Sequence, residues 1–464
     1  MTDTFDVIVL GAGPPGENAA GRAADGGLSV AIIEERLVGG ECSYYGCIPS
    51  KTMIRPGDIL AAARRVPGAV QAVTGSIDVA AALAQRDYMT SNWDDSGAVP
   101  WLDGKGITLI RGTALFAGEK TVEVEVPGSA PRRVTANKAV VVACGTRPLV
   151  PPIDGIADVG AWDNRDATSA KEVPRRLLVL GGGAIGAEMA QCFKRLGTDE
   201  VTVVEGGPRL LAREEPFAGE ELRTAFEAEG ITVITGARMS AVSREGPVGP
   251  VTATLADGRT ISADEILVAV GRTPNTDRIG LETIGLSGVA GKYLPVDKKL
   301  RVDGRDWLYA VGDIAGLALL THMGKYQGRL VGDILAGKDV EDIADHVAIP
   351  RVTFTDPQVA AVGMTEADAH DKGIHTRTVS YQVGDVPGAY TQGNNIRGTG
   401  QIVVDEARRV IVGATFTGPG VQEIVHAATI AIVGEVPLDT LWHAVPSFPT
   451  VSEVWLHLLE EYGL

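Results

Sequence analysis

The stretch DVIVLGAGPPGENAAGRAADGGLSVAIIE, residues 6–34, decides the fold. Asp6 is followed by a continuous apolar run over residues 7–10, which is typical of a strand buried in a parallel sheet. A helix of small residues is expected from about Pro15 to Asp25, and a second strand over residues 29–34. Strand, glycine-rich turn, helix and strand together predict the start of a dinucleotide-binding domain.

The turn contains Gly11, Gly13 and Gly16 in the spacing G-x-G-x-x-G. The first glycine allows a tight turn, the second lets the backbone approach a pyrophosphate, and the third permits close packing of helix on strand. The N-terminus of the helix then directs its N–H groups at the phosphates. Glu34 ends the second strand, where a carboxylate accepts hydrogen bonds from a ribose.

The same unit recurs once. It has a strand over residues 176–180, a helix through Glu188 to about Leu196, and a strand over residues 201–204 that closes on Glu205. Its glycines have the same spacing: Gly181, Gly183 and Gly186. Two dinucleotide folds in one chain imply two dinucleotides, which favours an electron relay between cofactors.

Two further apolar strands, over residues 140–145 and 266–271, end in small-residue turns and return the chain to the two units. After about residue 346 the pattern changes to α+β without a glycine loop, which predicts a separate module. Its expected elements are strands over residues 346–363, 400–405 and 410–417, and helices over residues 421–433 and 451–462.

Length and charge limit the possible partners. The chain has 464 residues, which is too long for one compact core. It has 42 Lys and Arg against 59 Asp and Glu, a formal charge of −17, which argues against nucleic acid or an acidic membrane as partner. No apolar run reaches about 18 residues, and the N-terminus lacks the basic region of a signal peptide. We therefore expect a cytoplasmic protein.

Two of the four cysteines lie in GGECSYYGCIPSK, residues 39–51. The chain lacks the two-pair cysteine pattern of a zinc site, and we expect no metal ligands. In an ideal helix, Cα atoms five residues apart lie roughly 8–9 Å apart, whereas a disulfide prefers about 4.4–6.8 Å. A bridge between Cys42 and Cys47 therefore needs a distorted first turn, which Gly46 and Pro49 permit. Such a bridge would be reducible, and the alternative is two buried reduced cysteines.

This cysteine stretch, after an N-terminal G-x-G-x-x-G, resembles the FAD-dependent pyridine nucleotide-disulfide oxidoreductases, which include dihydrolipoamide dehydrogenase, glutathione reductase and mercuric reductase. The resemblance spans nearly the whole chain. Residues 143–148 are similar to the family's A-T-G-x-x-P turn, and residues 271–275 match its G-R-x-P-N. Residues 310–313 match the second FAD motif, residues 320–322 begin the helix that points at the flavin, and residues 350–366 look like the opening of the dimerisation domain.

The resemblance implies an α/β fold with two Rossmann-like dinucleotide-binding domains plus a C-terminal α+β dimerisation domain. The implied FAD-binding domain comprises residues 1–155 and 278–345. Residues 156–277 would form the NAD(P)-binding domain and residues 346–464 the dimerisation domain. The implied cofactors are FAD and NAD, with NADP possible, and the implied partners are a second copy of the chain and a small-molecule electron acceptor.

The resemblance also implies roles for particular residues. Cys47 would be the flavin-facing thiolate and Cys42 the thiol that exchanges with substrate, while Lys51 and Glu188 would lie by the flavin and the nicotinamide. A positive Lys51 there stabilises a thiolate and the reduced flavin. The implied catalytic residues are Cys42, Cys47, Lys51, Glu188 and Glu453. The implied cofactor-binding residues are Gly11, Gly13, Gly16, Glu34, Lys51, Gly145, Asp313, His322, Gly181, Gly183, Gly186, Glu205 and Gly271. The other two cysteines, Cys144 and Cys192, are expected to serve packing.

The nicotinamide cofactor is expected in the second unit. Glu205 can accept a hydrogen bond from a free ribose 2′-OH and would repel a 2′-phosphate, which favours NADH. Arg209 and Arg213 lie nearby and could clamp that phosphate, which leaves NADPH open.

The chain departs from the family pattern near its C-terminus. Disulfide-reducing relatives end in H-P-T-x-x-E, whose His protonates the leaving thiolate across the dimer and whose Glu orients that His. Here the stretch reads SFPTVSE, residues 447–453, so that Phe448 stands in the place of the His and Glu453 is retained. Phe cannot transfer a proton, and His443 could substitute only if the loop differs. A smaller departure is Glu41, where the family usually has Thr.

These observations favour an enzyme that passes electrons from NAD(P)H through FAD and the Cys42–Cys47 pair to a quinone, a metal ion or an activated disulfide. One alternative is a dihydrolipoamide dehydrogenase or dedicated disulfide reductase with a substitute proton donor. The other is a redox sensor that binds flavin and NAD without turnover.

Overall fold

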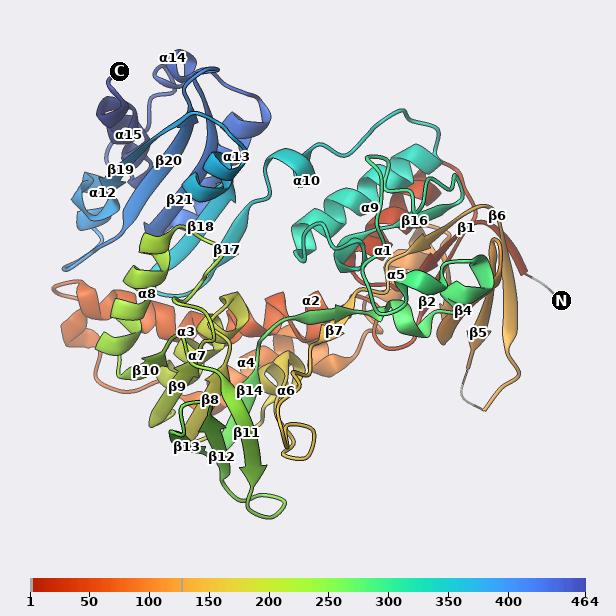
Figure 1. Ribbon diagram of the computed structural model, residues 1–464, viewed down its shortest axis with the longest axis horizontal. Helices are drawn as coiled ribbons and strands as arrows, with labels where there is room; N and C mark the ends of the chain where they lie inside the picture. Colours follow the sequence, from red (N-terminus) through yellow and green to blue (C-terminus); the bar gives the residue numbers. More distant parts are fainter. Residues whose placement is uncertain (1–2, 127) are drawn as a thin grey trace. The chain divides into compact units, whose positions relative to one another are not determined.

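The computed structural model describes residues 3–126 and 128–464 (Figure 1). These residues divide into two compact units. Unit 1 comprises the described residues up to Pro49, Asp87–Leu149 and Gly271–His346, and unit 2 comprises Ser50–Arg86, Val150–Val270 and Val347–Leu464. Among the described residues, none of the helices is both long and apolar enough to cross a bilayer.

Unit 1 is built on a mixed sheet with a parallel centre. Its strands, in the order in which they pair, are β3 (Thr108–Arg111), β2 (Val30–Glu34), β1 (Asp3–Leu10), β6 (Arg132–Val142), β5 (Thr121–Glu125) and β4 (Thr113–Gly118), and β16 (Leu308–Ala310) also pairs with β6. The apolar run of β1 is buried on both faces, and Val7, Ile8 and Val9 are fully inaccessible. The first strand, helix and strand predicted from the sequence are confirmed.

Two helices pack side by side in unit 1, α1 (Pro14–Asp25) and α9 (Thr321–Leu335) (Figure 1). Small residues permit the close approach. A Cβ added at Gly328 of α9 would lie 2.3 Å from the Pro15 carbonyl oxygen of α1, and one at Gly332 would lie 2.4 Å from Arg22 Cβ. The small-residue composition of α1 therefore serves helix packing as well as the turn before it.

The other elements of unit 1 are short. They are α2 (Gly40–Tyr44), α5 (Val99–Gly104) and an antiparallel ribbon of β7 (Thr146–Pro148) with β15 (Arg272–Pro274). The residues of α3 (Cys47–Arg65), α4 (Val79–Met89) and α10 (Ala344–Val347) are divided between the two units.

Unit 2 contains the second dinucleotide-binding fold. Its parallel sheet has the order β10 (Ile231–Ile234), β9 (Glu200–Val204), β8 (Arg176–Leu180) and β14 (Glu265–Val268). The associated helices are α6 (Asn164–Ser169), α7 (Ala184–Arg195) and α8 (Pro216–Ala228), and an antiparallel sheet has the order β11 (Met239–Arg244), β12 (Val251–Leu255), β13 (Thr260–Ala263). The predicted recurrence of the βαβ unit is confirmed.

The C-terminal part of unit 2 is an antiparallel sheet with helices. Its strands have the order β17 (Arg351–Thr353), β18 (Gln358–Gly363), β21 (Val410–Gly418), β20 (Thr399–Asp405) and β19 (Thr376–Gln382). Its helices are α11 (Glu366–Asp371), α12 (Pro387–Tyr390), α13 (Val421–Val433), α14 (Leu438–Leu441) and α15 (Val454–Tyr462). The predicted α+β pattern is therefore confirmed, and α13 has the predicted bounds. These residues belong to the same compact unit as the second dinucleotide-binding fold, so the separate module stays a prediction.

Two details of that prediction are wrong. Residues 346–363 form two strands and not one, because Pro357 has no N–H to donate to a ladder and the chain turns before it. Residues 451–462 begin as a 3₁₀ turn over Val451–Glu453 before α15.

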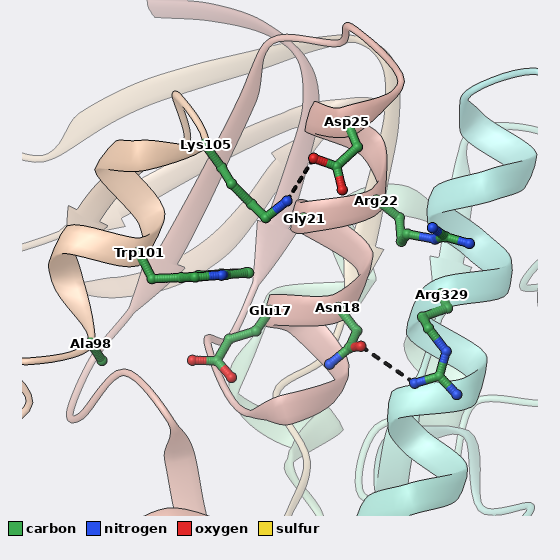
Figure 2. A pocket seen from close by; sticks show the side chains of 9 residues that line it. All are labelled: Glu17, Asn18, Gly21, Arg22, Asp25, Ala98, Trp101, Lys105 and Arg329. Carbon is green, nitrogen blue, oxygen red and sulfur yellow. Dashed lines mark hydrogen bonds and ion pairs between the residues drawn. The ribbon is translucent and has the colours of Figure 1, made fainter.

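A cavity of about 420 Å³ lies in unit 1 along α1. Figure 2 shows Glu17 facing it with Trp101 of α5, while Lys105 pairs with Asp25 and Arg329 with Asn18. Burial, with a smaller contribution from the charge of Glu34, raises the pKa of the Glu17 carboxyl to about 7 from its ordinary 4.5.

This pKa predicts a pH dependence of stability. Between the two pKa values the folded chain holds the Glu17 proton more tightly than the unfolded chain does, so the free energy of unfolding falls as pH rises from about 4.5 to about 7. Glu17→Gln removes that loss. We expect the variant to match the parent at pH 5 and to melt about 1–3 °C higher at pH 8, measured by calorimetry. An equal melting temperature at pH 8 would contradict the assignment.

Candidate active site

The first glycine turn has the shape of a pyrophosphate cradle. A Cβ at Gly11, whose φ is +101°, would lie 2.5 Å from the Ala143 carbonyl oxygen, and one at Gly16 would lie 2.0 Å from the Gly11 oxygen. At Gly13 a Cβ would meet nothing nearer than Pro15 Cδ at 3.9 Å. The outer glycines therefore let chain segments touch, whereas the middle one leaves its backbone open to a phosphate, as FAD requires.

The second turn repeats this geometry. A Cβ would lie 2.5 Å from the Ala269 oxygen at Gly181 and 2.0 Å from the Gly181 oxygen at Gly186, and would meet nothing within 4 Å at Gly183. The residues of both turns thus fit a bound dinucleotide.

Glu34 and Glu205 are held in the same way. Glu34 accepts hydrogen bonds from the N–H of Ala12 (2.7 Å) and of Arg36 (2.7 Å). Glu205 accepts them from the N–H groups of Gly182 and Gly207, both at 2.6 Å. Each carboxylate is therefore tied to the loop that would carry the pyrophosphate. Burial raises the pKa of Glu34, because a buried site disfavours the charged form of a carboxyl group. This is expected for a carboxylate that is positioned to bind a ribose.

Arg272 connects three residues of unit 1. Its guanidinium donates to Thr146 Oγ1 (2.6 Å), lies 3.7 Å from Asp313, and pairs with Glu41 at 3.5 Å. Thr146 also donates to Asp313 at 2.7 Å, and burial raises the pKa of that carboxyl. This arrangement explains the departure at Glu41, since its charge is paired with Arg272.

The cysteine stretch forms two helices and not one distorted helix. Cys42 lies in α2, which ends at Tyr44, and Cys47 is the first residue of α3. Gly46 stands at the break, where a Cβ would lie 3.1 Å from the Glu41 carbonyl oxygen. The break lets the two side chains approach each other. Both cysteines are thiols in this structure.

The two thiols differ in their surroundings. A hydrogen bond with Cys47, then burial, raises the pKa of the Cys42 thiol. Cys47 Sγ lies 3.4 Å from Thr321 Oγ1. Cys47 is thus at the N-terminus of α3 and contacts the first residue of α9, and helix N-termini stabilise a thiolate.

Lys51 lies one helical turn after Cys47 on α3. In unit 2 its Nζ pairs with Glu188 Oε2 at 2.6 Å and lies 4.7 Å from the centre of the Phe354 ring. The Phe354 N–H donates to the other oxygen of Glu188 at 2.9 Å. The predicted Lys51–Glu188 pair therefore exists, and Phe354 holds both partners through its ring and its backbone.

The other predicted residues have simple positions. Gly145 and Gly271 flank the β7–β15 ribbon with φ values of +63° and +141°, and His322 is exposed in the first turn of α9. Cys144 packs against a hydrophobic core and Cys192 lies inside another, which confirms their packing role. Burial raises the pKa of Cys144 to about 12.

Phe448 is 74% exposed, and the nearby Trp442 and Val445 are exposed as well. Glu453 is only 7% exposed, and its Oε2 has no hydrogen-bond partner among the residues that the structure describes. His443 is exposed and does not line the cavity that contains Phe448 and Glu453. The retained carboxylate therefore lacks the imidazole that the family pattern places beside it.

Sequence reasoning missed Phe354, Thr321 and the ion pair of Arg272 with Glu41. Each acts through a contact distant in sequence. The one available signal was that Thr321 and Arg272 stand inside motifs matched to the family.

The comparisons with known proteins cover almost the whole chain. The pyridine nucleotide-disulphide oxidoreductase model matches residues 5–328, and the dimerisation domain of the same family matches residues 349–459. The chain is 32% identical to a mercuric reductase of Staphylococcus aureus, covering 97% of this chain and 81% of the relative. It is 31% identical to a dihydrolipoyl dehydrogenase of Chlamydia muridarum, covering 98% and 96%.

Solved structures give the same result. The Cu(II) complex of the HOCl-induced flavoprotein disulfide reductase RclA from Escherichia coli matches with a TM-score of 0.87 and 25% identity over 99% of each chain. LpdA from Mycobacterium tuberculosis matches with a TM-score of 0.87 and 25% identity over 100% of each chain.

The dimerisation domain supports a homodimer. The predicted fold class is confirmed. The alternative of a redox sensor without turnover is wrong, because the members of this family are enzymes. The chain belongs to the pyridine nucleotide-disulfide oxidoreductase family, whose enzymes depend on FAD and take their electrons from NAD(P)H.

Proposed function

We propose that this enzyme passes electrons from NADH through FAD and the Cys42–Cys47 pair to an acceptor that needs no proton from an imidazole, foremost a thiol-binding metal ion. The observation that carries the proposal is Phe448, which stands where disulfide-reducing relatives have their acid. Residues 1–155 and 278–345 would bind FAD, residues 156–277 NADH, and residues 346–464 would form the dimer.

Bound FAD would accept a hydride and pass the electron pair on. The net reaction at the thiols is NADH + H⁺ + disulfide → NAD⁺ + dithiol. Lys51, paired with Glu188 and one turn from Cys47, supplies positive charge to that end of α3. Cys42 would be the thiol that meets the acceptor.

A metal ion suits this site for two reasons. Soft thiolates bind Hg²⁺ and copper. Two electrons from the dithiol would reduce one Hg²⁺ to the metal or two Cu²⁺ to Cu⁺, while the disulfide re-forms and the two thiol protons pass to solvent. No thiolate leaves in that step, so none has to be protonated. The presence of Phe448 in place of the His therefore does not lower the rate of metal-ion reduction. A mercuric reductase and a copper complex of a flavoprotein disulfide reductase among the similar proteins support this choice.

A panel of acceptors tests the proposal. Purified FAD-loaded enzyme is supplied with NADH and, in parallel anaerobic assays, with Hg²⁺, Cu²⁺, a benzoquinone, lipoamide or glutathione disulfide. We expect kcat/KM for a metal ion to exceed that for either disulfide by at least about 100-fold, since a missing general acid costs about 10²–10⁴. Faster reduction of lipoamide than of every metal ion would contradict the proposal.

NADH is the expected donor because of Glu205. Its carboxylate, fixed by Gly182 and Gly207, would repel a 2′-phosphate. The guanidinium of Arg209 is already engaged with the carbonyl oxygens of Ala212 (3.0 Å) and Glu214 (3.1 Å). We expect kcat/KM to favour NADH by at least about tenfold with a dye acceptor, and Glu205→Gln to narrow that ratio. A tenfold preference for NADPH would show that an arginine determines the cofactor.

A further inference from the structure

Two buried carboxyl groups of unit 1, those of Asp342 and Asp345, lie against each other. The two residues are 1% and 9% exposed. Each uses one oxygen as an acceptor: Asp342 Oδ1 accepts from the Asp345 N–H at 3.2 Å, and Asp345 Oδ2 accepts from Gln327 Nε2 at 2.7 Å. The other two oxygens, Asp342 Oδ2 and Asp345 Oδ1, are inaccessible and have no hydrogen-bond donor among the described residues.

A proton held between the two side chains would satisfy these oxygens. Carboxylates can only accept hydrogen bonds, whereas a protonated carboxyl group also donates one. Burial raises the pKa of the Asp345 carboxyl, and the charge of Asp342 and a hydrogen bond between the two side chains raise it further, while the donation from Gln327 lowers it. The pair therefore retains one proton at a pH where an isolated aspartate has lost its own.

Few charged groups face the pair from the neighbouring elements. The imidazole of His346 on α10 lies 3.9 Å from Asp342 Oδ2 and is 46% exposed. On α9, the hydroxyl of Tyr326 accepts from the Ile343 N–H at 3.1 Å. Lys298 accepts the Asp342 N–H with its carbonyl oxygen, and its residue as a whole is exposed. Within the described residues, no lysine or arginine forms an ion pair that could balance a second charge on the two carboxyl groups.

Gln327 connects the pair to the turn of the second FAD motif. Its side chain is fully buried, and its Oε1 accepts from the Gly312 N–H at 2.6 Å while its Nε2 donates to Asp345. A Cβ added at Gly312, whose φ is +77°, would lie 2.6 Å from Pro15 Cγ, so this turn touches the helix that follows the first glycine turn. The next residue is Asp313. A displacement of Asp345 would therefore reach both segments that fit FAD.

We propose that Asp342 and Asp345 share one proton and that Asp345, through Gln327, positions the Gly312 turn for FAD. When that proton passes to solvent, two carboxylates face each other in a buried site, and one of them is displaced toward water. Gln327 then loses the acceptor that fixes its amide, and the Gly312 N–H loses a fixed partner. FAD is held most tightly while the proton is in place, whichever electron acceptor the enzyme uses.

Asp345→Asn tests the proposal, because an amide reproduces the protonated carboxyl group. The amide oxygen can accept from Gln327, and Nδ2 can donate to Asp342 at every pH. The rate of FAD release from the holoenzyme is measured by the fluorescence of freed flavin at pH 6 and at pH 9. We expect the parent to release FAD at least about fivefold faster at pH 9 than at pH 6. Asp345→Asn should release it at the parent's pH 6 rate at both, and Asp342→Asn should behave in the same way.

Glu17→Gln is the matched control, since it changes another carboxyl group of unit 1 whose pKa is raised, to about 7. This variant should keep the parent's pH dependence of FAD release. In the same Glu17→Gln background, infrared difference spectra between pH 6 and pH 9 should contain the C=O band of a protonated carboxyl group, and the further substitution Asp345→Asn should remove it.

Three results would overturn the proposal. The first is a parent rate of FAD release that does not rise between pH 6 and pH 9. The second is an Asp345→Asn variant that keeps the parent's pH dependence or that releases FAD faster than the parent at pH 6, as a merely structural role would predict. The third is an infrared band that is absent from Glu17→Gln or unchanged by the further substitution Asp345→Asn.

Discussion

Cys47→Ser and Cys42→Ser are each expected to lower NADH-dependent reduction of the physiological class of acceptor by at least about 10³-fold. Serine cannot form the disulfide, so the variant has no group that can carry the electron pair from FAD to the acceptor. The geometry supports this role for the pair, because Cys42 shares a hydrogen bond with Cys47, and Cys47 is the first residue of α3 and contacts the first residue of α9. The measurement is steady-state kcat/KM with Hg²⁺ or Cu²⁺ under anaerobic conditions.

Two controls make that result specific. Cys144→Ser changes a cysteine that packs against a core and should retain the parent rate within about twofold. Reduction of a dye that accepts electrons from flavin should survive in all three variants, which shows that FAD and NADH still bind. Parental metal-ion reduction in Cys42→Ser would mean that the dithiol is not part of the path.

Phe448→His is expected to raise the reduction of lipoamide or glutathione disulfide by about tenfold or more while leaving dye reduction unchanged. The substitution restores a group that can protonate a leaving thiolate. Glu453, buried and with a carboxylate oxygen that lacks a partner in the described structure, is available to orient the new imidazole. The measurement is kcat/KM for the disulfide in parent and variant, over pH 6–8.

The matched control is Phe448→Gln, which is polar but cannot serve as the acid and should not gain disulfide activity. The parent rate is equally informative. If the parent already turns over lipoamide at about 10² per second or faster, Phe448 does not mark a lost proton donor. His443→Ala would then identify a substitute acid through loss of that rate.

The sequence was sufficient to predict those features that depend mainly on residues close together in the chain. The spacing of the glycine turns could be predicted because it follows the pattern of a βαβ unit, in which Gly16 meets the Gly11 oxygen, whereas the contact of Gly11 with Ala143 is distant in sequence. Glu34 and Glu205 followed from the same pattern, since each strand ends beside its turn.

Other parts required the folded chain. The helix break at Gly46 replaces the expected distorted turn, because α2 ends before Cys47. The carboxylate of Glu41 is explained by its ion pair with Arg272, which lies far along the chain and which the sequence does not indicate. Phe354 contacts Lys51 and Glu188 across long separations in sequence, and no local periodicity encodes such contacts. The unpartnered oxygen of Glu453 likewise appears only once its burial is known.

Counting thiols tests the central claim, that NADH reduces a disulfide of Cys42 and Cys47, most directly. Air-oxidised holoenzyme is treated anaerobically with excess NADH, quenched in denaturant, and its free thiols are titrated against an untreated sample. The chain has four cysteines, so with one disulfide we predict 4 − 2 = 2 thiols before NADH and four after it, with no NADH-dependent gain in Cys42→Ser or Cys47→Ser. Flavin reduction by NADH with an unchanged thiol count in the parent enzyme would contradict the account.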